Sequence, residues 1–352
     1  MDFIPGQLMA AEIAEQPRVL HRLLTDGAES ILEVGRQLAL RKPRFVLFAA
    51  RGTSDHAALF GKYLTEIEVG LPAGLISPSS STVYGARADL RECLFVAVSQ
   101  SGGSPDLVDS LSVARRCGAT TVAVTNNVAS DLADAAAFTV DVCAGVERAV
   151  AATKSYTAQL LALFLLLSSL RVSGINALER AAPLAEAAQE TLDSGADIAA
   201  VAARLRFATR LITTARGYSY PSAREGALKL METSYLSALA FSGADLLHGP
   251  LAMIDADQPV IAIVSPGRGG DAMLPVLRAL QERKADLTVV GAAPARVHDG
   301  EGQLQVATTG VAEELLPILE ILPLQQLALR LALDRGGDPD SPRGLSKVTE
   351  TW

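Results

Sequence analysis

The sequence predicts an α/β fold of two tandem domains, each a parallel β-sheet with helices on both faces. Three observations predict it. From Arg44 onward, short apolar runs alternate with helical segments, which is typical of parallel strands buried on both faces. The order of these parts repeats, since Ala50-Arg51-Gly52 matches Ala215-Arg216-Gly217, 165 residues later. The chain also has 352 residues, of which 49% are hydrophobic, so two cores can form.

Two further matches keep nearly the same spacing. Val98-Ser99 with Gly102 matches Val264-Ser265 with Gly267, and Thr121-Val122 matches Thr288-Val289, at offsets of 166 and 167 residues. Unrelated segments rarely keep such spacing, so we predict a duplicated three-layer domain. The expected limits are an N-terminal helical arm at 1–43, a first domain at 44–175, a helical linker at 176–205, a second domain at 206–335 and a tail carrying Lys347 at 336–352.

The elements of the first repeat follow from local patterns. Spaced apolar residues predict a helix over 7–42, interrupted near Pro17 and Gly27. Apolar runs bounded by turn residues predict strands at Phe45–Ala50, Gly74–Ser77, Leu94–Ser99, Thr120–Thr125 and Phe138–Val142. The segments between them predict helices at 54–69, 105–117 and 153–172, with a short turn near 130–136.

The second repeat begins after a predicted helical linker over 178–203. Its apolar runs predict strands at Leu211–Thr214, Pro259–Val264, Leu287–Val290 and Leu304–Ala307. A helix is expected from Ser222 to Leu239, because no proline and no glycine after Gly226 interrupts it and Ser222 can serve as its N-cap. A last helix is expected at 311–333.

Composition excludes several classes of protein. The net charge is −8 and no basic run occurs, which argues against a nucleic-acid partner. Cys93, Cys117 and Cys143 are odd in number and widely spaced, which indicates neither a disulfide framework nor a metal site. The N-terminus lacks signal-peptide features, and the longest apolar stretch, 160–170, is too short to span a bilayer. We expect a cytoplasmic protein that needs no cofactor and has no membrane partner.

Charged residues form one stripe on the predicted helix over 222–239. Glu225, Lys229 and Glu232 occupy positions i, i+4 and i+7 among Ala, Leu, Met and Tyr residues. A solvated ion pair is one interpretation. The other is a buried acid–base group, because charges among apolar residues must be paired, neutralised or used. His248 follows in a turn that Gly249 and Pro250 fix, so groups suited to proton transfer lie within a short span.

The turn after the predicted strand at 94–99 is rich in hydroxyl groups. It reads Ser99-Gln100-Ser101-Gly102-Gly103-Ser104-Pro105-Asp106, with a proline suited to a first helical turn. Anions bind beyond the carboxyl ends of parallel strands, so this turn is a candidate phosphate site, with Thr53 or Ser54 beside it; a turn that only connects is the alternative. It lacks the Walker and dinucleotide motifs. The matching turn at 265–267 lacks the serines.

Five motifs carry a family resemblance. They are SQSG at 99–102, ATK at 152–154, EGALKL at 225–230, HGPLAMI at 248–254 and PRGLSK at 342–347. With these motifs in this order, the chain from about residue 44 onward resembles the double-SIS-domain phosphosugar isomerase family, which includes the isomerase half of glutamine-dependent glucosamine-6-phosphate synthase. The resemblance implies two SIS domains of flavodoxin-like type, in agreement with the predicted duplication.

The resemblance also implies a role for each matching residue. The phosphate of a hexose 6-phosphate would be held by Ser99, Gln100, Ser101 and Ser104. Thr53 would lie near the sugar, and Val150 and Ala152 would line the sugar pocket. Glu232 would move a proton between C1 and C2, and Lys229 would assist it. His248 would open the sugar ring, and Lys347 would form an imine with the keto sugar. In the family this histidine reaches the neighbouring subunit's site, which implies a homodimer.

Departures from the synthase pattern favour deamination. Gly103 replaces a Glu, Ala152 a Ser and Met231 a Lys, and no cysteine precedes Cys93, so a glutaminase domain is not expected. Gly103 with the following Ser-Pro-Asp is more similar to stand-alone SIS deaminases. We predict conversion of glucosamine 6-phosphate and water to fructose 6-phosphate and ammonia. Alternatives are ammonia-dependent synthesis, a galactosamine-6-phosphate deaminase, a fructosamine-6-phosphate deglycase and a phosphosugar sensor without turnover.

Overall fold

The computed structural model describes residues 4–171, 176–194, 197–292 and 302–347. By packing, the chain forms two compact units. The first unit takes the described parts of 18–147, 154–182 and 346–352, and the second takes those of 1–17, 148–153 and 183–345. The chain therefore passes from one unit to the other several times, and the tail residue Lys347 belongs to the first.

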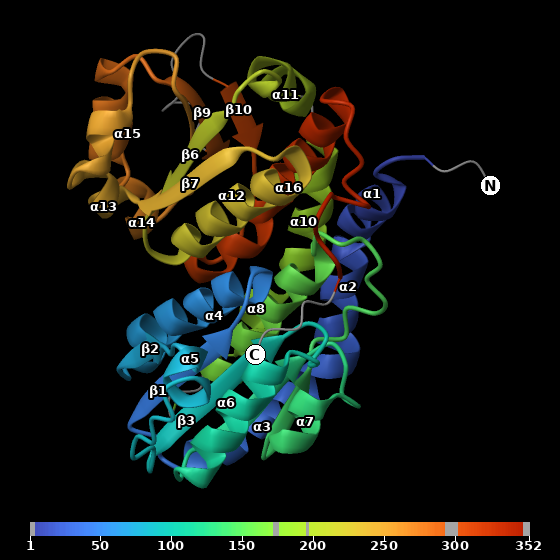
Figure 1. The fold of residues 1–352 in the computed structure, drawn as a ribbon, viewed down its shortest axis with the longest axis vertical. Helices are drawn as coiled ribbons and strands as arrows, with labels where there is room; N and C mark the ends of the chain where they lie inside the picture. The colour runs from blue at the N-terminus through green and yellow to red at the C-terminus, as the bar shows by residue number, and fades with distance from the viewer. Residues whose placement is uncertain (1–3, 172–175, 195–196, 293–301, 348–352) are drawn as a thin grey trace. The chain divides into compact units, whose positions relative to one another are not determined.

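The first unit contains a parallel sheet of order β2-β1-β3-β4-β5 among its described residues (Figure 1). Every residue of its central strand is buried, as expected for a strand covered on both faces. The register pairs Ala50 with Val98 and Val98 with Val124, so three strands end at the same level. The strands are β1 Phe45–Ala50, β2 Ala73–Leu75, β3 Cys93–Ser99, β4 Thr120–Thr125 and β5 Phe138–Asp141.

Helices cover both faces of the first sheet. α3 (Ala28–Leu40), α4 (Thr53–Leu64) and α8 (Lys154–Ser168) pack together over one face, while α5 (Pro78–Thr82), α6 (Pro105–Arg116) and α7 (Asp131–Ala135) lie over the other. All residues of α8 from Lys154 to Leu167 are buried, and the apolar run at 160–167 fits a helix enclosed on every side. A π-helical turn, Thr65–Val69, continues α4, and another, Leu23–Gly27, joins α2 (Gln16–Arg22) to α3.

The second unit repeats the topology of the first. Its sheet has the order β10-β9-β8-β6-β7 in the part of the chain that the structure describes, again all parallel, so β7 lies beside β6 as β2 lies beside β1. This shared order confirms the predicted duplication and the α/β class. The strands are β6 Arg210–Ala215, β7 Ser237–Ser242, β8 Pro259–Ile263, β9 Asp286–Gly291 and β10 Gly302–Gln305.

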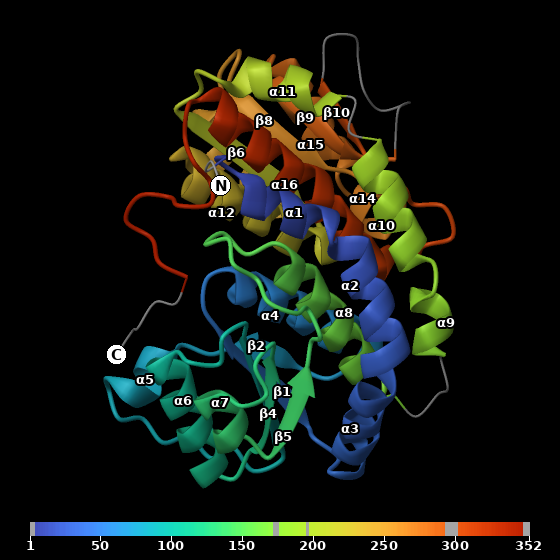
Figure 2. The same cartoon turned by 90° about the vertical axis from the view of Figure 1, so that its right-hand side faces the viewer.

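The second sheet is also covered on both faces (Figure 2). One layer contains α10 (Leu184–Asp193), α11 (Ile198–Leu205), α12 (Tyr220–Ser234) and α16 (Leu316–Asp334), and α1 (Gln7–Ala14) packs on α16. The other contains α13 (Gly243–Leu247), α14 (Arg268–Asp271) and α15 (Leu274–Glu282). Within the described residues, one helical stretch, Glu313–Asp334, is long and apolar enough to cross a membrane, and 83% of its apolar window is buried, as in a core helix.

The helix predicted from Ser222 to Leu239 is wrong at both ends. It begins at Tyr220, and Ser222 is buried in its first turn, where its hydroxyl donates to the Pro317 carbonyl (2.9 Å) instead of capping the helix. Tyr235 ends it in the left-handed conformation (φ 56°). The next residues pair with β6 as strand β7, because a free sheet edge outweighs the local preference for helix.

Other differences concern the boundaries of elements. The predicted linker consists of three short helices, α9 (Ala177–Ala181), α10 and α11. Helices α13 and α15 and strand β7 were not predicted, and the last helix begins with a 3₁₀ turn at Glu313–Leu315 rather than at 311. The interruptions expected near Pro17 and Gly27 are present as the break between α1 and α2 and as the π-helical turn.

Candidate functional site

Two loops of the first unit meet where its strand order reverses. The reversal lies between β1 and β3, the position where parallel α/β sheets bind ligands. α4 begins after β1 at Thr53, and α6 begins after β3 at Pro105. The Arg51 guanidinium on the first loop pairs with the buried carboxylate of Asp106, in the first turn of α6 (2.6 Å). Two helix N-termini are thus tied together at one edge, where their free amides can face an anion.

The serine-rich turn is folded tightly on itself. The Ser99 hydroxyl is buried and accepts a hydrogen bond from the Gly102 amide (3.1 Å), and the Ser101 hydroxyl accepts one from the Gly103 amide (3.3 Å). Gly102 has φ +66°, and a Cβ atom there would collide with the Ser130 side chain, so the turn requires glycine. Gln100, Ser101 and Ser104 are half-buried, and the Ser104 hydroxyl does not cap its own helix.

The corresponding turn of the second unit already holds an anion. The Glu313 carboxylate accepts hydrogen bonds from the Arg268 amide (3.0 Å) and the Gly269 amide (2.8 Å) in the turn after β8. A Cβ atom on Gly267 would collide with this carboxylate. These two amides are therefore taken by the chain itself, which fits the prediction that only the first repeat is built for phosphate.

The charged stripe on α12 is buried, so the interpretation as a solvated ion pair is wrong. Lys229 has no exposed side-chain surface and lies between Glu225 (3.3 Å, also fully buried) and Glu232 (2.5 Å, 22% exposed). Burial acts against the charge of Lys229, but Glu225 and Glu232 outweigh it and raise the lysine pKa. Lys229 is therefore a fixed cation, and Glu232 is the member of the stripe that a small molecule can reach.

His248 lies in the same unit as α12, at the end of α13, and is exposed. The predicted turn is present, because Gly249 has φ +129° and a 3₁₀ turn begins at Pro250. An exposed imidazole on a fixed turn can act on a group that approaches from outside the unit.

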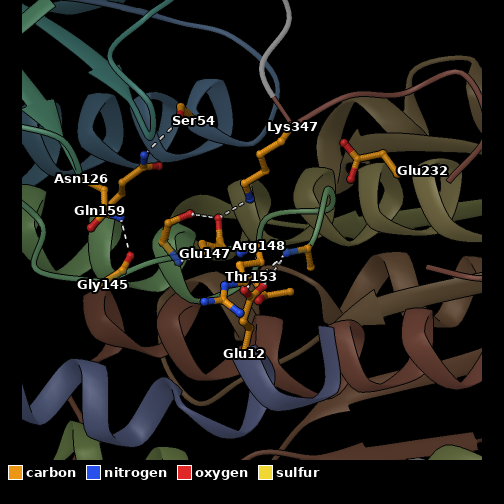
Figure 3. Close-up of polar contacts among 12 residues, drawn as sticks. Glu12, Ser54, Asn126, Gly145, Glu147, Arg148, Thr153, Gln159, Glu232 and Lys347 are labelled. Carbon is orange, nitrogen blue, oxygen red and sulfur yellow. Dashed lines mark hydrogen bonds and ion pairs between the residues drawn. The ribbon is translucent and has the colours of Figure 1, made fainter. Parts of the chain in front are cut away.

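Two buried glutamates that sequence reasoning missed, Glu12 and Glu147, bind backbone amides just before and just after the segment 150–152 (Figure 3). Val150 and Ala152 in this segment are half-buried. In the second unit, the Glu12 carboxylate accepts hydrogen bonds from the Arg148 amide (2.5 Å) and the Ala149 amide (3.4 Å). In the first unit, Glu147 accepts hydrogen bonds from the Ser155 amide (3.0 Å) and hydroxyl (2.8 Å). The one available signal was two acidic residues in largely apolar surroundings.

Lys347 is not the solvated surface lysine that a polar tail ordinarily carries. Its ammonium group lies 2.8 Å from the Glu147 carboxylate, and its side chain is 25% exposed (Figure 3). Earlier in the tail, the Asp340 carboxylate accepts hydrogen bonds from the Leu8 and Met9 amides (both 2.8 Å), and the Arg343 guanidinium lies over the Tyr235 ring (4.1 Å). The tail is therefore fastened at several points.

The described part of the chain shows no group of three or more His, Cys, Asp or Glu side chains that could hold a metal ion.

Comparisons with known proteins agree with the two-unit fold. The profile of the SIS domain matches residues 39–169 and 204–335. The glutamine–fructose-6-phosphate aminotransferase (isomerizing) of Methanothermobacter thermautotrophicus is 33% identical over 341 residues, which cover 96% of this chain and 56% of that protein. The chain thus spans little more than half the length of this relative.

Two solved structures are similar over nearly the whole chain. One, from Silicibacter pomeroyi DSS-3 and described provisionally as a phosphosugar isomerase, is 32% identical with a TM-score of 0.84, and the alignment covers 96% of this chain and all of that one. The other is the C-terminal domain of glucosamine-fructose-6-phosphate aminotransferase from Francisella tularensis, 27% identical with a TM-score of 0.85, covering 96% and 98% of the two chains.

Proposed function

The chain belongs to the SIS domain family, and on that basis we propose that it is an aldose–ketose isomerase that deaminates an amino-sugar phosphate. The proposed reaction converts glucosamine 6-phosphate and water to fructose 6-phosphate and ammonia. The observation that carries this proposal is the α12 stripe, in which a buried, fixed cation contacts a partly exposed carboxylate. Such a pair suits proton transfer between adjacent carbons, where negative charge develops on the substrate.

In the proposed mechanism the serine turn binds the phosphate and His248 helps to open the pyranose ring. Ring opening is needed because only the free aldehyde makes the C2 proton acidic. Glu232 then removes that proton and returns it to C1 through an enolamine, while the Lys229 cation offsets the developing charge. The nitrogen at C2 is left as a ketimine, which water hydrolyses to the ketone and ammonia.

Lys347 supports this last step in the proposal. Its amine adds to the ketimine carbon, ammonia leaves, and the lysine imine is hydrolysed to release the keto sugar and restore the amine. Val150 and Ala152 line the sugar in this arrangement. Ser99, Gln100, Ser101 and Ser104 are the proposed contacts to the phosphate, and Thr53 lies near the sugar in the proposal.

A second candidate is the reverse reaction, synthesis of glucosamine 6-phosphate from fructose 6-phosphate and ammonia. The relative from Methanothermobacter thermautotrophicus, named as an aminotransferase, favours it. The same acid–base groups serve both directions, because the steps are those of one reversible path. Gly103 in the serine turn is the feature that favours deamination.

A panel assay tests the proposal. The protein is incubated with glucosamine 6-phosphate, galactosamine 6-phosphate and fructosamine 6-phosphate, and ammonia and keto-sugar phosphate are measured together. We expect equal amounts of both products from glucosamine 6-phosphate. If glucosamine 6-phosphate forms from fructose 6-phosphate and ammonia in the reverse assay and no deamination is seen, the synthase is favoured. If no compound in either assay is converted, both candidate functions are rejected.

A further inference from the structure

We propose that Glu147 is the positioning residue for Lys347. It holds the tail amine at the start of α8 in the first unit. This inference rests on the proposed function, in which Lys347 supplies the amine, and it adds a residue that the proposed mechanism does not use. The observation behind it is the contact between a fully buried carboxylate and a lysine 200 residues away (Figure 3).

Glu147 is fixed by α8 independently of the tail. One carboxylate oxygen, Oε1, accepts the hydrogen bond from the Ser155 amide, and the other, Oε2, accepts that from the Ser155 hydroxyl. Ser155 lies in the first turn of a 15-residue helix, where the amides have no partner within the helix and the dipole favours an anion. The carboxylate therefore has a set position before Lys347 approaches.

The Lys347 side chain reaches further into the first unit than the residues just before it. Residues 343–346 are all exposed, and Lys347 is the residue whose side chain becomes mostly buried. Fixing a lysine side chain costs conformational entropy, which a solvated surface pair rarely offsets. Here the partner is a buried carboxylate, and a buried charge left without its partner is strongly unfavourable. The ion pair with Glu147 therefore sets the position of the Lys347 amine.

Two variants and a matched control separate this role from general stability. Glu147→Gln keeps the shape of the side chain and removes its charge, and Glu147→Asp keeps the charge and shortens the reach. Glu68→Gln removes a carboxylate of another partly buried ion pair in the same unit, with Arg171 (2.6 Å). Accessibility of Lys347 is measured by brief acetylation with an amine-reactive reagent and peptide mass spectrometry. Lys62, 29% exposed and paired with Glu66, is the internal reference.

We expect acetylation of Lys347 to rise on the order of tenfold in Glu147→Gln, because the docked tail then opens more often. The rise should be smaller in Glu147→Asp and absent in Glu68→Gln, with Lys62 unchanged in all three. With glucosamine 6-phosphate, kcat should fall roughly 100-fold with KM little changed, because the amine is misplaced while the phosphate turn is intact.

Unchanged acetylation of Lys347 in folded Glu147→Gln would overturn the inference. If thermal unfolding shows that this variant does not fold, Glu147→Asp decides in the same way. A wild-type protein that releases no ammonia from any amino-sugar phosphate would reject the proposed function, yet the acetylation result would still say whether Glu147 holds the lysine. The two failures are therefore distinguishable.

Discussion

Glu232 differs from the other members of the α12 stripe in being reachable. Glu225 and Lys229 are sealed in the core of the second unit, whereas Glu232 is 22% exposed and still in contact with the Lys229 ammonium. A proton-transfer group needs both access to substrate and a fixed neighbour of opposite charge. Glu232 is the proposed base and Lys229 the proposed neighbouring cation, and each can be replaced separately.

Replacing Glu232 by Gln should remove the base while keeping the shape of the side chain. We expect kcat for ammonia release from glucosamine 6-phosphate to fall by roughly 10² to 10⁴, with little change in KM, because phosphate binding is untouched. Steady-state kinetics with coupled ammonia detection measure this. Near-complete retention of kcat would contradict the assignment of Glu232.

Glu320 on α16 gives a pH-dependent test of the fold. It is fully buried and accepts a hydrogen bond from the Ser219 hydroxyl (2.8 Å), and burial raises its pKa from 4.5 to about 7. The folded state therefore holds the proton more tightly than the unfolded state. The stability that this proton contributes to the folded state is fully present below pH 4.5. It is lost as the pH rises towards and through 7.

The comparison is between wild type and Glu320→Gln, unfolded by urea at pH 5 and pH 8. From pH 5 to pH 8, the free energy of unfolding of Glu320→Gln should rise relative to that of wild type by roughly 3 kcal/mol, since one pKa unit corresponds to about 1.4 kcal/mol. A difference independent of pH would show that Glu320 does not titrate in this way.

At the scale of elements, the serine turn between β3 and α6 depends on one glycine. Gly102 lies in the left-handed region beside Ser130, whereas a Cβ atom added at the exposed Gly103 would meet only the Ser101 hydroxyl, at 3.8 Å. Gly102→Ala should raise KM for the sugar phosphate on the order of tenfold or more, because strain of about 1–2 kcal/mol and a steric collision distort the turn. Gly103→Ala, in the same turn but without the collision, is the comparison and should raise KM less. Equal effects from both variants would contradict this account.

The elements of the first sheet can be predicted from the sequence better than those of the second, for physical reasons. β1, β3 and β4 are apolar runs buried on both faces, so composition alone indicates them. β7 is an edge strand of mixed exposure that directly follows a helix, and its Ala and Leu residues also suit a helix, so no local pattern marks its start. The repeat did contain the signal, because β7 occupies the place of β2.

The site residues divide in a similar way. The α12 stripe and the serine turn are local patterns with a chemical meaning, so the sequence could indicate them. The contacts of Glu12 with 148–149 and of Glu147 with Lys347 join residues more than 130 positions apart, and no local pattern contains such a pairing. The contact of the Glu313 carboxylate with the Arg268 amide, in the turn after β8, is also long-range.

At the scale of the whole molecule, we propose a homodimer in which His248 acts on the neighbouring subunit's sugar. His248→Ala and Glu232→Gln should each be nearly inactive as separate proteins. If the imidazole and the carboxylate of one site come from different chains, mixing and reassociating the two variants should restore part of the wild-type activity, because some mixed dimers contain one complete site. Size-exclusion chromatography verifies the dimer, and no recovery from a verified mixed dimer would contradict the arrangement.

We propose that the serine turn and the α12 stripe act on one linear sugar. A crystal structure of the Glu232→Gln variant with glucosamine 6-phosphate tests it most directly. We predict that the phosphate contacts the turn at Ser101 and that C1 and C2 lie within about 3–3.5 Å of the residue 232 side chain, the range of a reactive contact. A sugar bound at the turn with these carbons out of reach of residue 232 from every subunit would contradict the account.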